Sequence, residues 1–167
     1  MNQPTTITQP KMLGVRLALK ALEALSDSRF EQGSGFCERY ARQVFEACYP
    51  ARQDASKHFL ASARTSMDAF QGTGFVFLDN VGGMTYATDV ELEHGDFVYK
   101  GVRTSGVAGH VGIVFTNIVK GEPQLCVAEN SSYHINNPGP QTIQGAKGWR
   151  TLEQFGAFEM VVRFDGK

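Results

Sequence analysis

The run at 108–115, Ala-Gly-His-Val-Gly-Ile-Val-Phe, constrains the fold more than any other part of the chain. Valine, isoleucine and phenylalanine beside glycines are typical of a buried β-strand. His110 opens this strand after a glycine-rich loop, where a rigid scaffold can present a side chain to solvent. The run therefore predicts a buried strand with one titratable side chain at its accessible end.

The first half of the chain favours helices. Apolar residues at helical spacing predict a helix over 11–25, and a second is expected over 36–49, where Pro50 ends it. A third is expected from Asp54 or Ser56 to about residue 70. Residues 1–10 are polar and contain two prolines, so we expect a disordered tail there and a single domain over 11–167.

The second half favours strands, which we expect at 75–78, 97–99, 111–116, 125–129 and 158–164. The third and fourth of these are expected to form an antiparallel pair across a turn at 120–123. Residues 130–148 are polar and are expected to be a long loop. Helices followed by a meander of strands predict an α+β fold.

Composition excludes several classes of protein. The chain has 167 residues, 42% of them hydrophobic, and a net charge of -1, which is typical of a globular domain. This charge gives no reason to expect nucleic acid or an anionic membrane as partner, and we expect a monomer. No stretch approaches the ~18 apolar residues of a membrane span. The first residues lack the apolar core of a secretory signal, so we expect synthesis in the cytoplasm.

Cysteine and histidine spacing argues against metals and other cofactors. Three cysteines without a CxxC pair do not suggest a disulfide framework or a structural zinc site, and the four histidines show no HExxH spacing. Cys48 and Cys126 lie inside apolar patterns and are expected in the core. Cys37 is different, because it heads a predicted helix after a Gly-Ser-Gly loop, where the helix dipole stabilises a thiolate. The alternative for Cys37 is a small buried hydrophobe.

Strand alternation suggests which side chains meet. His110 and Gly112 lie on one face of their strand, and Asn130 lies on the small-residue face of the next, opposite to Glu129. If these faces are on the same side of the sheet, a helix headed by Cys37 can pack there. A nucleophile, a base and an orienting group would then converge as Cys37, His110 and Asn130. A β-bulge would give the third role to Glu129.

Four motifs in fixed order carry a resemblance to a known superfamily. They are Cys-Glu-Arg-Tyr at 37–40, Gly-Asp-Phe-Val at 95–98, Gly-His-Val-Gly-Ile-Val at 109–114 and Ala-Glu-Asn-Ser-Ser at 128–132. The set resembles the successive motifs of papain-like cell-wall hydrolases, which include CHAP amidases and NlpC-type endopeptidases. The resemblance spans about residues 33–164. It implies a papain-like fold in which N-terminal helices pack on a small antiparallel sheet.

The resemblance also implies a function. It is that of a cysteine peptidase or amidase that cuts amide bonds in bacterial peptidoglycan. Cys37 matches the nucleophile, His110 the base, and Asn130 or Glu129 the third residue, while the loops 101–109 and 130–148 are expected to wall the cleft.

Small chains of this kind are similar to phage lysins, virion-associated lysins or injected antibacterial effectors, which reach the wall by release, by injection or within a virion. Two alternatives stay open: a non-catalytic phage structural or adaptor protein, and a thiol acyltransferase, for which the sequence offers no apolar membrane-docking segment.

Overall fold

The structure is a computed structural model, and it describes residues 10–60, 62–66, 75–79, 91–101 and 109–164. The predicted tail lies almost entirely outside these residues. The first helix begins at Pro10, one residue before its expected start. Proline is well tolerated in the first turn of a helix, where its missing N–H has no helical partner anyway.

The described helices are α1 (Pro10–Leu25), α2 (Cys37–Cys48), α3 (Gln53–Ser56), α4 (Ala63–Ser66), α5 (Ser132–Asn136) and α6 (Leu152–Phe155). The first two confirm the predicted helices. The third prediction, one helix from 54 to 70, is wrong because α3 ends at Ser56. The backbone N–H of Leu60 donates instead to the Ser66 hydroxyl at 2.7 Å, a local bond that competes with a continuous helix. Residues 67–70 lie outside the described residues.

The strands are β1 (Phe75–Asp79), β2 (Phe97–Lys100), β3 (His110–Val119), β4 (Glu122–Asn130), β5 (Thr142–Gln144), β6 (Lys147–Thr151) and β7 (Met160–Phe164). They form one antiparallel sheet in the order β1-β7-β2-β3-β4-β6-β5, which confirms the α+β class. The predicted hairpin of β3 and β4 is confirmed. Its turn places Lys120 and Gly121 at φ 52° and 82°.

The prediction of a long loop over 130–148 is wrong, because this segment contains α5, β5 and the start of β6. Strand β6 pairs with β4, from Asn130 opposite Lys147 to Cys126 opposite Thr151. The sequence did not indicate β6 because two of its buried residues, Lys147 and Arg150, are charged, and charged residues suggest an exposed segment. Each is buried with hydrogen-bond partners, which removes most of the cost of taking a charge out of water.

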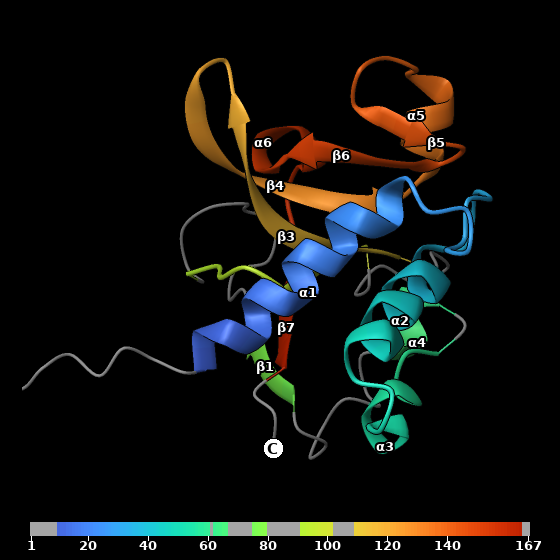
Figure 1. Ribbon diagram of the computed structural model, residues 1–167, viewed down its shortest axis with the longest axis vertical. Coiled ribbons are helices and arrows are strands. Elements are labelled where there is room, and N and C mark those ends of the chain that lie inside the picture. The colour runs from blue at the N-terminus through green and yellow to red at the C-terminus, as the bar shows by residue number, and fades with distance from the viewer. Residues whose placement is uncertain (1–9, 61, 67–74, 80–90, 102–108, 165–167) are drawn as a thin grey trace, which may run out of the picture.

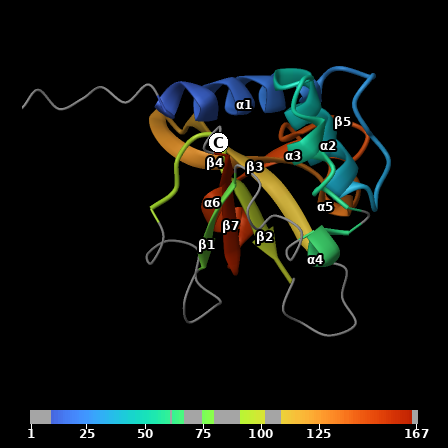
Figure 2. The ribbon, with the colours of Figure 1, turned by 90° about the horizontal axis from the view of Figure 1, so that it is seen from below.

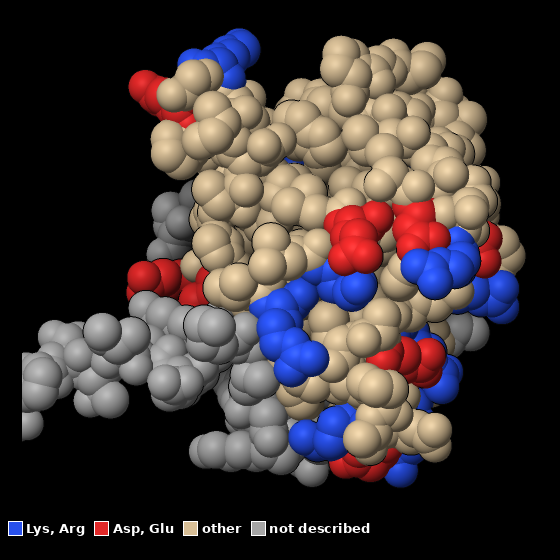
Figure 3. All heavy atoms as spheres, in the orientation of Figure 1, with Lys and Arg blue, Asp and Glu red and all other residues tan. Residues whose placement is uncertain are grey.

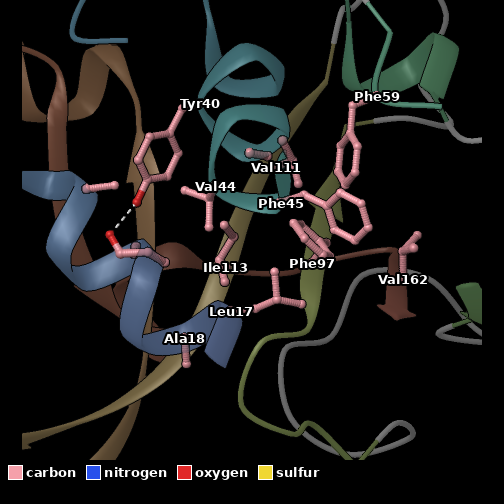
Figure 4. Packing of buried hydrophobic residues seen from close by; sticks show 14 of the residues in the cluster. Leu17, Ala18, Tyr40, Val44, Phe45, Phe59, Phe97, Val111, Ile113 and Val162 are labelled. Carbon is pink, nitrogen blue, oxygen red and sulfur yellow. Dashed lines mark hydrogen bonds between the residues drawn. The ribbon is translucent and has the colours of Figure 1, made fainter. Parts of the chain in front are cut away.

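The larger part of the core lies between the sheet and the first two helices. Helices α1 and α2 run along the same face of the sheet (Figures 1 and 2). On the side of α2 that faces the sheet, Phe45 packs near Phe97 and Ile113 (Figure 4). The Tyr40 hydroxyl donates to the Ala21 carbonyl at 2.7 Å, which joins the two helices inside this core.

The opposite face of the sheet carries a smaller apolar cluster. Val98, Val114 and Val127 pack there against Phe155 of α6 and Phe158. Thr151 and Gln154 cap α6 reciprocally, which fixes this short helix at the end of β6. The sheet is therefore covered on both faces. Polar residues of the sheet lie where β2 and β4 end and β3 begins, at Lys100, Glu129, Asn130 and His110.

The surface over α1 and α2 carries acidic and basic side chains next to one another (Figure 3). Across the described part of this face neither sign forms a continuous patch. None of the described helices is long and apolar enough to cross a membrane.

Candidate active site

Cys37 is the first residue of α2 and is partly buried at the edge of the main core. The preceding turn needs glycine at Gly35, where φ is 87°. Phe36, at the N-cap, contributes no capping side chain. The N–H groups of the first helical turn therefore have no carbonyl partner within the helix, and they lie beside the thiol. As predicted, Cys48 and Cys126 are buried.

His110 is the first residue of β3 and contacts both Cys37 and Glu129. Its Nε2 lies 2.6 Å from Oε1 of Glu129, and the ring lines the same cleft as the Cys37 side chain. With Nε2 engaged, Nδ1 is the nitrogen left for the sulfur. Burial lowers the pKa of His110, but the hydrogen bonds with Cys37 and Glu129 outweigh burial and raise the pKa to about 9.

Glu129 is completely buried and is surrounded by three basic side chains. Besides His110, it accepts from Nε2 of His134 at 2.9 Å and from two nitrogens of Arg150 at 2.5 and 2.8 Å. Burial raises the pKa of Glu129, but the bonds with His110, His134 and Arg150 outweigh burial and hold the pKa well below its ordinary value. The carboxylate is therefore ionised and held in one orientation.

Asn130 forms no hydrogen bond with His110, so the prediction that Asn130 orients the ring is wrong in this structure. Its amide instead donates to the carbonyls of Gly33 and Phe36, at 2.8 and 3.3 Å. These bonds tie the end of β4 to the turn that leads into α2. Asn130 therefore holds the backbone that places Cys37, and Glu129 occupies the orienting position.

The strand register explains this error. The alternation within each strand is as predicted, but Ile113 pairs with Ala128 and Val114 with Val127. The face of β3 that carries His110 and Gly112 is therefore shared with Glu129, while α2 packs on the opposite face. Nor does Gly112 make room for a helix: a Cβ there would lie 2.2 Å from Cγ1 of Val127, a neighbour across the strands. No β-bulge at Glu129 is needed to give it the third position.

A cleft of about 480 Å³ opens over these residues. Cys37 and His110 line it, together with Lys100, Tyr133 and Arg150. The predicted wall at 130–148 contributes 130–133, Asn136 and Asn137. Most of the other predicted wall, 101–109, lies outside the described residues.

Sequence reasoning missed His134 and Arg150, which anchor Glu129. One signal for His134 was Gly148: a Cβ at this position would lie 2.6 Å from Nδ1 of His134, so the strand needs glycine where the ring approaches. Arg150 gave no such signal, because an arginine between Trp149 and Thr151 reads as the solvent face of a strand.

Within the described residues, no group of three or more His, Cys, Asp or Glu side chains is arranged to hold a metal ion. The chain matches no protein-family model, no curated protein and no solved structure in the comparisons that we made.

Proposed function

We propose that this chain is a papain-like cysteine hydrolase that cuts amide bonds in bacterial peptidoglycan, with Cys37, His110 and Glu129 as its triad. The observation that carries the proposal is the place of His110, which shares a cleft with a thiol at a helix start and hydrogen-bonds to a buried carboxylate. A thiol, a base and an orienting acid in this order are what acyl transfer requires. The cleft over them gives a substrate access to the sulfur.

Each member of the triad has a chemical role. The proton of Cys37 passes to His110, which becomes an imidazolium, and the sulfur then attacks the carbonyl carbon of the amide. As the C–N bond breaks, His110 returns this proton to the leaving amine, and a thioester remains on Cys37. Water then attacks the thioester with His110 again as the base, which releases the acid and restores the thiol. Glu129 keeps the ring oriented and stabilises the imidazolium in both halves of the reaction.

The start of α2 supports the charge that develops on the substrate oxygen. The backbone N–H of Cys37 belongs to an uncapped helix N-terminus next to the sulfur. Such N–H groups, together with the positive end of the helix dipole, favour an oxyanion in the tetrahedral intermediate.

The choice of peptidoglycan rests on the four ordered motifs at 37–40, 95–98, 109–114 and 128–132, which resemble those of cell-wall hydrolases. The test is digestion of purified peptidoglycan from a panel of bacteria, with the released fragments identified by mass spectrometry. New amine and carboxylate ends within the stem peptides or crosslinks are expected.

Two variants make this test specific. Cys37→Ala is expected to release no fragments, while Cys48→Ala, a cysteine at the other end of the same helix, is expected to retain activity. Equal release by the protein and by Cys37→Ala contradicts the proposal, because Cys37 would then not be the nucleophile. No release from any wall also contradicts it and favours a non-catalytic role. Transfer of an acyl group to an added amine without hydrolysis would favour the acyltransferase alternative.

A further inference from the structure

The charged side chains that line the cleft beside Cys37 are all basic. Among the described residues of the lining these are Lys100, His110 and Arg150, and neither aspartate nor glutamate is present. The remaining polar side chains of this lining are hydroxyls and amides, which carry no charge. A cleft with this lining attracts an anionic group and repels a cationic one.

Two of these three basic groups already have a negative partner. Arg150 holds Glu129 through two hydrogen bonds, and His110 lies between Glu129 and the Cys37 thiol. Lys100 forms no ion pair with any carboxylate of the described chain. Among the described residues of the lining, the positive charge without a negative partner is therefore that of Lys100.

The position of Lys100 is fixed beside the base. Lys100 ends β2 and pairs with His110 of β3, so both side chains lie on the same face of the sheet. Its Nζ donates to the carbonyl of Phe155 and lies 4.2 Å from the centroid of the Phe155 ring. An ammonium has three donors, so this anchorage leaves two N–H groups for a ligand.

The electrostatics of Lys100 are those of a cation that lacks a counter-ion. Burial and the neighbouring Arg150 lower the pKa of Lys100 to about 8, although Glu129 acts in the opposite direction. A carboxylate that entered the cleft would supply the missing negative charge. It would form charge-assisted hydrogen bonds, which are about twice as strong as neutral ones.

We propose that Lys100 binds a carboxylate group of the substrate close to the scissile amide. This inference rests on the proposed function, because the stem peptides of peptidoglycan carry free carboxylates near their amide bonds. It deepens that function by selecting stems with a free carboxylate over stems in which the carboxylate is amidated.

A pair of alkylating reagents tests the site without any substrate. Iodoacetate and iodoacetamide transfer similar groups to a thiolate with loss of iodide, but only iodoacetate carries a carboxylate. The rate of modification of Cys37 is measured with each reagent at pH 7 by mass spectrometry of the Cys37 peptide. The quantity compared between variants is the ratio of the two rates, which cancels any general change in the reactivity of Cys37.

The ratio of iodoacetate to iodoacetamide reactivity is expected to fall about 10-fold in Lys100→Met, as for the loss of one charge-assisted hydrogen bond. Lys100→Arg keeps the charge and is expected to retain most of the ratio. Lys57→Met removes an exposed lysine remote from the cleft and is expected to leave the ratio unchanged. An unchanged ratio in Lys100→Met, or an equal fall in Lys57→Met, would overturn the proposal.

A second measurement uses two synthetic stem peptides that differ only in whether the carboxylate next to the cleaved bond is free or amidated. The protein is expected to prefer the free acid in kcat/KM, and Lys100→Met is expected to lose this preference. A preference for the amidated peptide, or one retained in Lys100→Met, contradicts the inference. If neither peptide and no wall is cut, the proposed function fails, and the alkylation ratio still decides whether Lys100 binds a carboxylate.

Discussion

His110 and Glu129 lie on the same face of neighbouring strands, with Nε2 and Oε1 2.6 Å apart. The carboxylate is completely buried, and two nitrogens of Arg150 donate hydrogen bonds to its oxygens. Its charge raises the pKa of His110, whereas burial alone would lower it. The ion pair with Glu129 therefore helps to set the pH up to which His110 stays protonated beside Cys37.

Glu129→Gln is expected to lower the rate of hydrolysis at least ~100-fold, a usual contribution of a positioned base and its partner. In the protein His110 holds a proton below about pH 9 and gives it to the leaving amine, so activity is expected to decline as the pH rises through that value and this proton is lost. Glutamine removes the negative charge, which lowers the pKa of His110 and moves this alkaline limb to lower pH. The measurement is kcat/KM against pH, with alkylation of Cys37 by iodoacetamide as a second readout. An unmoved limb in Glu129→Gln would contradict the assignment.

Asn130→Ala is expected to act differently, because Asn130 holds the turn before α2 and forms no hydrogen bond with His110. Loss of its bonds to the Gly33 and Phe36 carbonyls is expected to lower the free energy of unfolding by about 1–3 kcal/mol. The alkaline limb is expected to stay where it is in the unmodified protein. Thermal melting and the pH profile of the same sample check this, and a limb displaced as far as in Glu129→Gln would return the orienting role to Asn130.

The sequence patterns predict the elements that carry strong periodicity. Helices α1 and α2 and the hairpin of β3 and β4 follow from apolar spacing that both the backbone and the core satisfy. The same patterns place Cys37 at a helix start and His110 at a strand start, where the structure has them. Local patterns were thus enough to place the proposed thiol and base at the ends of their elements.

What the patterns do not predict is how neighbouring strands align. A parity argument assigns residues to faces within one strand, but only the register says which faces of two strands coincide. Burial of Glu129 seemed costly from sequence because His134 lies in the predicted loop and Arg150 reads as the solvent face of a strand, so neither was expected beside the carboxylate. Strand β6 was missed for the same reason, since a buried Lys147 has no apolar signature.

Lys147→Met is expected to destabilise the fold without removing a group from the cleft. The buried amine donates to the carbonyls of Ala24 and Asp27, at 2.7 and 2.6 Å, and so joins the end of α1 to β6. Methionine fills the same space but leaves both carbonyls without this donor, a loss of about 2–3 kcal/mol in the free energy of unfolding. Urea denaturation measures it, and Lys120→Met in the exposed hairpin turn is the control. Equal midpoints for the two variants would show that the contact contributes nothing.

Glu38 follows Cys37 in α2, and its carboxyl is buried between the helix and the sheet. Burial raises the pKa of Glu38 to about 7, although Tyr99, Ser66 and His110 lower it in part. The unfolded chain loses this proton near pH 4.5, whereas the folded protein keeps it until about pH 7. Between these values the folded state binds more protons, so the contribution of Glu38 to stability is present below pH 4.5 and is lost as the pH rises to about 7.

Glu38→Gln is expected to remove this loss, because an amide of nearly the same shape does not ionise. The difference in the free energy of unfolding between Glu38→Gln and the unmodified protein is expected to grow by about 3 kcal/mol from pH 4 to pH 8, in favour of the variant. Urea denaturation at both pH values measures this difference. Glu46→Gln, a half-exposed carboxylate on the same helix that pairs with Arg42, controls for the removal of one negative charge. A difference that is the same at both pH values, or that grows equally in Glu46→Gln, would mean that Glu38 does not hold a proton in the folded protein.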